Sequence, residues 1–170
     1  LSANAAHAQV GSYYNDLNVN IGDAFLLGSA ALNAGSVRLT LEGAGAQNAG
    51  YVMNSVGTVE TFSASFDLFF NADTDSAADG IAFSLGVMPD TLNTNVYDER
   101  GADQGLSVSF DWFEGAPLDP RIFVRYNGTQ LASVPSIISL VNDEGFFRRA
   151  TVELDALGRV TVTYNGIVVV

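Results

Sequence analysis

The side chains in this sequence best suited to binding chemistry are acidic residues placed beside alternating segments. Two stretches carry them, "ADGIAFSLG" (Ala78–Gly86) and "VSFDWFEGAPLDP" (Val108–Pro120). Ionised carboxylates coordinate hard cations and accept hydrogen bonds from sugar hydroxyls. A plain Asp-Gly turn before a strand is the alternative interpretation of Asp79 and Gly80. The two stretches together are the candidate site.

Charge limits the partners that such a site could serve. The 170 residues contain 7 basic residues, all arginine, against 19 acidic ones, for a formal net charge of -12. A surface of this sign repels phosphate backbones and anionic lipid. We therefore expect no nucleic-acid partner and no membrane insertion, which also fits the absence of an apolar run of about 20 residues. Cations and neutral hydroxylated ligands remain open.

The elements that must position the acidic residues follow a period of two. Alternation of apolar with small or polar residues predicts strands with one buried face. The candidate segments are Ser36–Glu42, Thr61–Phe70, Gly80–Gly86, Leu106–Phe113, Arg121–Gly128 and the hairpin Arg149–Gly166. The hairpin is expected to turn at "DALG" (Asp155–Gly158), with Val152, Leu154, Val160 and Val162 facing inward.

Turn-rich clusters separate these segments, and no window shows a helical stripe. The clusters are "EGAGAQNAG" (Glu42–Gly50) and "NADTDSAADG" (Asn71–Gly80). Short antiparallel strands with one apolar face each can bury those faces only against a second sheet. The sequence therefore predicts an all-β sandwich.

Several stretches in this order resemble the concanavalin A-like, L-type lectins, most closely the bacterial lectin-like modules of large secreted or surface proteins. The stretches are "LLGSAALNAGSVRLT" (Leu26–Thr40), "FSASFDLFF" (Phe62–Phe70), "ADGIAFSLG" (Ala78–Gly86), "GLSVSFDWFEGAPLDPRIFVRYNG" (Gly105–Gly128) and "VELDALGRVTVTYNG" (Val152–Gly166). The resemblance implies a jelly-roll sandwich of two antiparallel sheets, with a ligand site in loops at one end, often beside calcium.

The resemblance gives Asp79 and Gly80 a specific role. In lectins of this group the aspartate of the corresponding Asp-Gly pair follows a cis peptide bond and accepts hydrogen bonds from two sugar hydroxyls. Charge-assisted bonds from vicinal hydroxyls suit an ionised carboxylate. Gly115 stands where the family places an asparagine that binds the sugar, so its side-chain amide is missing at that position.

The same resemblance implies a calcium site in the second stretch. Asp111, the carbonyl of Phe113, Asp119 and Glu114 would supply oxygens of the kind that Ca2+ prefers. Ser109 and Arg121 replace the glutamate and histidine that hold a transition metal in the family, so that second metal is not expected. The acidic loop before Asp79 offers Asp73 and Asp75 as alternative calcium ligands, or it is a solvated turn.

Catalysis is not expected. Glycosidases of this fold that retain configuration need two carboxyls about 5 Å apart. "SFDWFE" has Ser109 in place of the nucleophile, and "ELDALG" ends in Gly158 in place of the acid. The one histidine, His7, lies near the start of the chain, and without cysteine there is no thiol nucleophile.

The expected organisation is one sandwich domain over residues 10–170, incomplete at its C-terminus because "GIVVV" (Gly166–Val170) stops inside an apolar strand. Residues 1–9 read as a signal-peptide remnant or a linker. The expected function is a calcium-assisted, carbohydrate-binding module of a larger secreted or surface protein, bacterial in type. Its partners would be a glycan or polysaccharide and neighbouring domains of the same chain. The alternative is a structural or adhesion module without sugar binding.

Overall fold

Every regular element in the described part of the chain is a β-strand. The computed structural model describes residues 17, 21, 24–40, 47–53, 59–70, 80–88, 99–111, 120–135 and 146–170. Its strands are β1 (Ala24–Gly28), β2 (Ala31–Asn33), β3 (Ser36–Arg38), β4 (Ala49–Met53), β5 (Phe62–Leu68), β6 (Gly80–Leu85), β7 (Leu106–Asp111), β8 (Arg121–Tyr126), β9 (Thr129–Pro135), β10 (Arg148–Leu154), β11 (Val160–Tyr164) and β12 (Ile167–Val168). The all-β class predicted from the alternation is confirmed. Within these ranges no helix is long and apolar enough to cross a membrane.

The chain divides into two units. The first consists of residues up to Phe62 together with Leu154–Arg159, and the second of Ser63–Glu153 together with Val160–Val170. In the first unit β1 pairs antiparallel with β4, and β2 pairs antiparallel with β3. The short β2–β3 hairpin turns at Ala34 and Gly35, both with positive φ.

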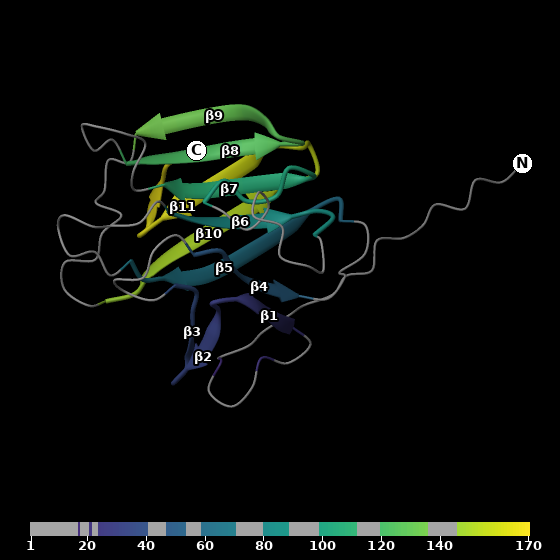
Figure 1. Ribbon diagram of the computed structural model, residues 1–170. Coiled ribbons are helices and arrows are strands. Elements are labelled where there is room, and N and C mark those ends of the chain that lie inside the picture. Colours follow the sequence, from purple (N-terminus) through teal and green to yellow (C-terminus); the bar gives the residue numbers. More distant parts are fainter. Residues whose placement is uncertain are drawn as a thin grey trace, which may run out of the picture. The chain divides into compact units, whose positions relative to one another are not determined.

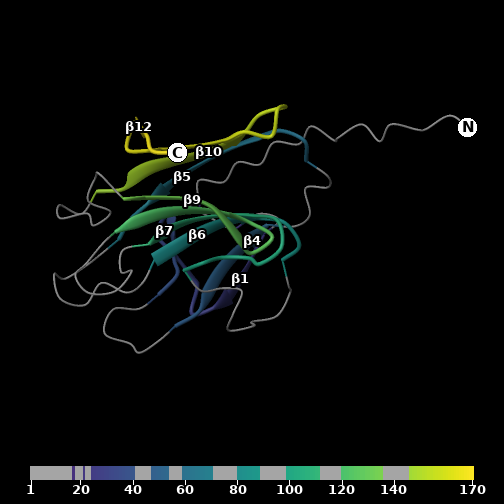
Figure 2. The ribbon, with the colours of Figure 1, turned by 90° about the horizontal axis from the view of Figure 1, so that it is seen from above.

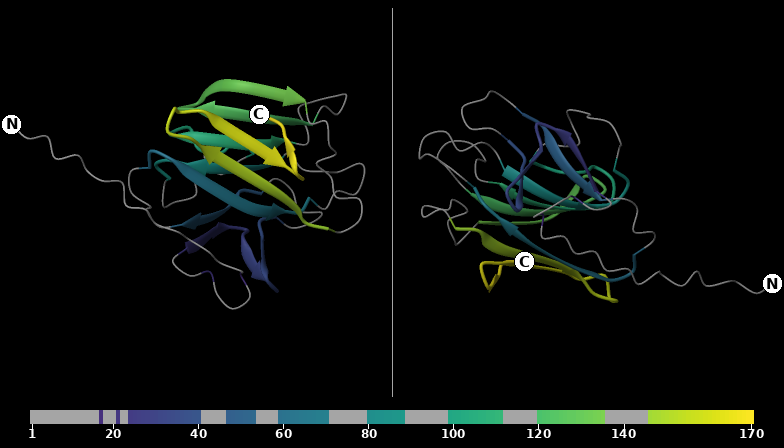
Figure 3. Two further views of the ribbon diagram at one scale, coloured as in Figure 1. Left: turned by 180° about the vertical axis from the view of Figure 1, so that it is seen from behind. Right: turned by 90° about the horizontal axis from the view of Figure 1, so that it is seen from below.

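Two four-stranded sheets make up the second unit, except for Phe62 of β5 and Leu154 of β10, which belong to the first unit. One has the order β12-β11-β10-β5 and the other the order β6-β7-β8-β9. In the second sheet each strand pairs antiparallel with the next along the chain, and the four run side by side in Figure 1. Figure 2 shows the two sheets as separate layers, and the left view of Figure 3 shows the β10–β11 side with its yellow strands in front.

Aromatic rings join the two layers. Phe66 of β5 stacks on Phe83 of β6 with ring centroids 5.6 Å apart, and it meets the edge of Phe110 of β7 at 6.2 Å. Phe110 also contacts Tyr164 of β11 at 5.7 Å. Offset and edge-on pairs of this kind stabilise a core beyond their buried area. The inner faces of both sheets thus pack against each other as a β-sandwich, which confirms that part of the prediction.

The C-terminal hairpin forms as predicted. β10 and β11 are neighbours in one sheet, and Val152 and Val162 are fully buried, while Leu154 and Val160 are half-buried. The remaining inward positions are Ala150 and Tyr164, also fully buried. Burial raises the pKa of the Tyr164 phenol, because the ionised form is poorly solvated there.

The predicted turn at "DALG" is held by one carboxylate. Asp155 Oδ1 accepts hydrogen bonds from the backbone N–H groups of Leu157 and Arg159, both at 2.9 Å. Its Oδ2 accepts from the Arg159 guanidinium at 2.7 Å. These bonds, the Arg159 backbone donor first, lower the pKa of Asp155. The turn therefore depends on an ionised Asp155.

Charged residues on the outer face fix the pairing of β5 with β10. The Arg149 guanidinium donates to both carboxylate oxygens of Asp67, at 2.6 and 2.8 Å. Further along, the Ser63 hydroxyl donates to Glu153 at 3.3 Å. The partner numbers fall on one strand as they rise on the other, so the two strands are antiparallel. The hydrogen bond from Arg149 lowers the pKa of Asp67.

Two Asn-Gly pairs make hairpins that the sequence analysis did not identify. Asn127 and Gly128 join β8 to β9, and Asn165 and Gly166 join β11 to β12, all four with positive φ. Positive φ at both central residues is the geometry of the tight hairpin turn that Asn-Gly favours. The last strand thereby returns to pair with β11. Figure 3 shows this return in yellow beside the label C.

Some expectations need correction. Ala49 and Gly50, expected in the turn cluster Glu42–Gly50, are strand residues of β4. Strands β1, β2, β4 and β9 were not predicted; they are short, or half-exposed without clean alternation. Residues 71–79, the second expected turn cluster, and residues 1–9 lie outside the described residues.

Candidate functional site

The face of the β6–β9 sheet that points away from the core is largely polar. Period-two geometry puts alternate residues of each strand on this side. We call it the polar face; on β6, β7, β8 and β9 it consists of Gly80, Ala82, Ser84, Ser107, Ser109, Asp111, Arg121, Phe123, Arg125, Gln130, Ser133 and Pro135. On the opposite side, residues such as Val108, Phe110 and Ile122 are fully buried.

A segment of chain lies across the polar face and buries its centre. This covering segment is Glu99–Gly105, directly before β7. The carbonyl of Arg100 accepts hydrogen bonds from the Ser107 hydroxyl at 2.5 Å and the Ser109 hydroxyl at 3.2 Å. Both serines are fully buried as a result. Buried hydroxyls need such partners, and here the backbone of the covering segment provides them.

Gly101 allows the covering segment to lie this close. Its φ is +75°, and an added Cβ would lie 2.5 Å from the hydroxyl oxygens of both Ser84 and Ser107. The next residue, Ala102, donates its N–H to the Ser84 hydroxyl at 3.0 Å. A glycine is therefore required both by the backbone conformation and by the lack of room.

At one end of the polar face, the structure brings two predicted site residues together. Gly80 begins β6 and Asp111 ends β7, and the two are Cα partners in the antiparallel pairing. A Cβ on Gly80 would lie 2.5 Å from the Phe110 carbonyl oxygen and 3.3 Å from Cβ of Glu99. Gly80 is thus a close-contact position, with the Glu99 side-chain stem beside it. The Asp111 residue is 3% exposed.

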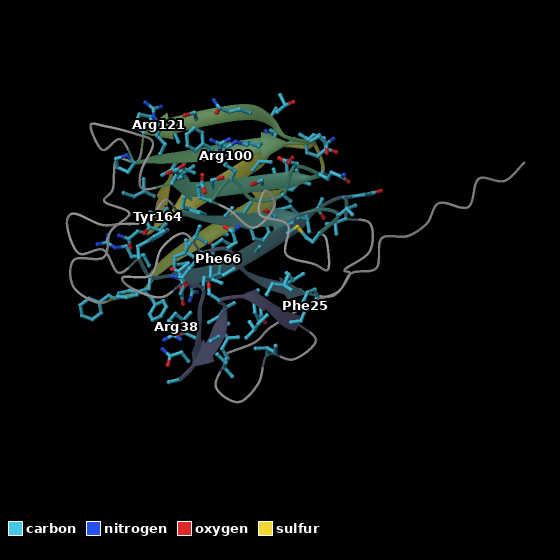
Figure 4. The ribbon with its side chains drawn as sticks, in the orientation of Figure 1. Phe25, Arg38, Phe66, Arg100, Arg121 and Tyr164 are labelled. Carbon is cyan, nitrogen blue, oxygen red and sulfur yellow. The ribbon has the colours of Figure 1, made fainter. Side chains whose placement is uncertain are left out.

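Arg121 is the Cα partner of Asp111 on the other side, so a cationic residue neighbours the buried aspartate in the register. The guanidinium of Arg121 donates to the Ser133 hydroxyl at 3.2 Å. Figure 4 labels Arg121 and Arg100 over this sheet. At this end one register row therefore holds an aspartate and an arginine, while the carboxylate of nearby Glu99 lies 3.8 Å from Nε of Arg100.

The other predicted site residues lie outside the described residues. They are Asp79 and Gly115 of the expected sugar site and Phe113, Glu114 and Asp119 of the expected calcium site, together with Asp73 and Asp75. Within the described residues, no three aspartate, glutamate or histidine side chains gather as a metal site would require. The structure thus describes one of the four expected calcium ligands, Asp111, and one of the three expected sugar-site residues, Gly80.

The opposite end of the polar face contains a hollow of about 360 Å3. It is lined by Arg100, Ala102, Asp103, Arg125, Gly128 and Gln130. The guanidinium of Arg125 donates to the Ser109 hydroxyl at 2.8 Å and lies 4.5 Å from the ring centre of Phe123. Hydrogen bonding and cation–π contact together hold the side chain in one orientation.

The walls of this hollow are tied to each other. Asn127 in the β8–β9 turn donates its N–H to the Gly105 carbonyl at 2.9 Å. In return, the Asn127 side-chain oxygen accepts from the N–H of Gly105 at 2.9 Å. The covering segment and the hairpin turn are thereby fixed in place, so the hollow is formed without a ligand.

Sequence reasoning missed the hollow and its arginines. Ser109 was considered as a replacement for a metal ligand and for a catalytic nucleophile, whereas in the structure it accepts a hydrogen bond from Arg125. The alternation of Arg121, Phe123 and Arg125 was a signal that two arginines share a face with Ser109. The position of Arg100 over this face could not be read from local pattern, because a covering segment has no period.

The described part of the polar face combines acceptors on carboxylates and hydroxyls with donors on guanidinium groups, which are the groups that bind a polar ligand. Comparison of the chain with protein-family models and with the sequences of curated proteins gives no match.

Proposed function

We propose that this chain is a carbohydrate-binding, lectin-like β-sandwich module, assisted by calcium, that belongs to a larger secreted or surface protein of bacterial type. The observation that carries the proposal is the pairing of Gly80 with Asp111. Asp79 precedes Gly80 in the chain, and residues 112–119 follow Asp111. The two stretches with the expected sugar and calcium ligands therefore start from the same end of the β6–β7 pair.

The fold supports the same proposal. In the concanavalin A-like jelly roll, two antiparallel sheets face each other and ligands bind at one end of a sheet. The antiparallel order β6-β7-β8-β9 opposite β5, β10 and β11 is compatible with that arrangement. The aromatic contacts between Phe66, Phe83 and Phe110 hold the β6–β7 pair against the other layer, which gives a rigid base for loops at its end.

The carboxylates would act in two ways. Asp79 would accept hydrogen bonds from vicinal sugar hydroxyls. Asp111 would bind calcium with Asp119, Glu114 and the Phe113 carbonyl. Because Asp111 is buried, its negative charge needs a counter-charge, and that is either the cation or the neighbouring Arg121. Calcium dependence therefore tells the two arrangements apart.

A glycan array read with and without calcium tests the proposal. The variants are Asp79→Ala and Asp111→Asn, with Glu60→Gln as a control that removes one exposed negative charge elsewhere. We expect calcium-dependent binding in the wild type and the control, and at least a tenfold loss of affinity in the two site variants, since charged hydrogen bonds are worth roughly 1.5–3 kcal/mol each.

Three other outcomes would each contradict a different part of the proposal. Binding that survives calcium removal and is lost with Asp79 would retain the sugar site and replace calcium by Arg121. Calcium binding by titration calorimetry without any glycan signal would favour the structural or adhesion module. Absence of both signals would reduce Asp79 and Gly80 to a turn before β6.

A further inference from the structure

The hollow at the Arg100–Arg125 end is separate from the site at Gly80 and Asp111. Ser107, in the row of the hollow, lies four residues before Asp111 on the same strand, which corresponds to about 13 Å at roughly 3.3 Å per residue. Gly80 and Asp111, the described residues of the expected sugar and calcium sites, lie at the other end. The hollow is therefore considered as a second binding site with a ligand of its own.

Arg125 is arranged differently from three other arginines of the described residues. Arg149 and Arg159 form ion pairs with Asp67 and Asp155, and Nε of Arg100 lies 3.8 Å from Oε1 of Glu99. Among the described residues Arg125 has no such carboxylate; its hydrogen bond goes to the neutral hydroxyl of Ser109, and its flat face covers Phe123. A guanidinium has five N–H donors, and this geometry leaves an edge available to a planar anion.

The remaining lining distinguishes the kind of anion. Arg100 adds a second guanidinium, Gln130 an amide that donates and accepts, and Asp103 a carboxylate that only accepts. The Glu99 carboxylate lies 3.8 Å from Nε of Arg100 and offsets part of its charge, so Arg125 provides most of the attraction for a single negative charge. The Asp103 carboxylate would repel an inorganic anion. It can accept hydrogen bonds from the hydroxyl groups of a sugar, which favours an anion that also carries hydroxyls.

We propose that this hollow binds a uronic acid residue of an acidic glycan. The sugar carboxylate pairs with Arg125 and Arg100, and its hydroxyls donate to Asp103 and exchange hydrogen bonds with Gln130. The volume of about 360 Å3 lies near the lower end of the roughly 300–1,000 Å3 usual for small-molecule sites, which suits one sugar ring. This inference rests on the proposed carbohydrate binding and names the class of sugar.

Titration of digalacturonic acid in calcium-free buffer tests the inference. A disaccharide limits long-range repulsion by the net charge, and the absence of calcium prevents metal bridging. Its dimethyl ester is the matched ligand, since it retains the hydroxyls and lacks the charges. We expect the acid to bind at least tenfold more tightly than the ester, which corresponds to one charged hydrogen bond or more.

Arg125→Gln and Arg100→Gln should each weaken binding of the acid by tenfold or more. Arg38→Gln is the control, because it removes the same charge from an exposed position of β3. The affinity of this variant for the acid should stay within twofold of the wild-type value. Arg125→Lys should recover little, because an ammonium keeps the charge without the planar fork. Urea unfolding of each variant checks that the fold is retained.

The inference would be overturned by no binding of the acid, by equal binding of acid and ester, by equal affinity in wild type and Arg125→Gln, or by equally tight binding of triglutamate. A loss in Arg38→Gln as large as in Arg125→Gln would reduce the effect to overall charge and would overturn it too. Neutral glycan binding that depends on Asp79 and Asp111, without a uronate effect, would retain the proposed function and remove only this inference.

Discussion

Replacing Gly101 by alanine tests whether the covering segment is held by close contact. The substitution has two costs. A residue with a Cβ at a φ of +75° costs roughly 1–2 kcal/mol. The added methyl group would also lie 2.5 Å from the hydroxyl oxygens of Ser84 and Ser107, so both hydroxyls must move.

The second cost can be worked from the hydrogen bonds that those hydroxyls make. Ser107 donates to the Arg100 carbonyl, and Ser84 accepts from Ala102. Each hydrogen bond contributes a net of about 1 kcal/mol, so the clash should cost about 2 kcal/mol, within the roughly 1–3 kcal/mol typical of overpacking. The expected loss for Gly101→Ala is therefore about 3–4 kcal/mol in the free energy of unfolding.

Gly166→Ala is the matched control, measured by urea denaturation followed by circular dichroism. Gly166 has a φ of +79°, belongs to the same unit, and has no atom within 4 Å of an added Cβ. It should lose only the backbone cost, about 1–2 kcal/mol. The entropy that alanine removes from the unfolded chain is the same for both variants and cancels. Equal losses in the two variants would refute the close-contact argument.

Two further predictions concern the sandwich itself. Val152→Ala removes two carbons from a fully buried position and should lower the free energy of unfolding, measured in urea, by about 2–3 kcal/mol. The control Val168→Ala, at an exposed position, should lower it by less than about 0.5 kcal/mol. Equal losses would contradict the core assignment. Asp67 and Asp155 have lowered pKa values in the folded state, so their contribution to stability is present above pH 3.8 and is lost as the pH falls through the lowered values. The double variant Asp67→Asn/Asp155→Asn should thus be less stable than the wild type at pH 7 and lose less stability on acidification, and parallel pH profiles would argue against these carboxylates.

The sequence predicted the strands whose pattern is regular and missed those whose pattern is broken. Alternation from Leu106 to Asp111 is complete because one face packs on the core and the other is polar. β9 lacks such a pattern, since a register shift at Val124 and Arg125 changes which of its residues face inward. The Asn127-Gly128 turn was the available sign that a further strand follows.

The candidate site was predictable only where it depends on strand register. Gly80 and Asp111 were assigned to one site from a resemblance, and antiparallel pairing places them side by side. The hollow was not predictable in this way, because it depends on Arg100 reaching the sheet from a segment without periodicity. Its formation follows from tertiary hydrogen bonds, those of Ser107 and Ser109 to the Arg100 carbonyl.

Ser109 connects these observations. In lectins of the proposed class, the corresponding position holds a glutamate that binds a metal. A serine there is small enough to be fully buried beneath the covering segment, where it donates to Arg100 and accepts from Arg125. A glutamate in the same place would accept from Arg125 but could not donate to a carbonyl, and its charge would lie against the Arg100 carbonyl oxygen. Ser109 therefore orients an arginine toward the hollow, a role that the glutamate expected from the resemblance would not fill in the same way.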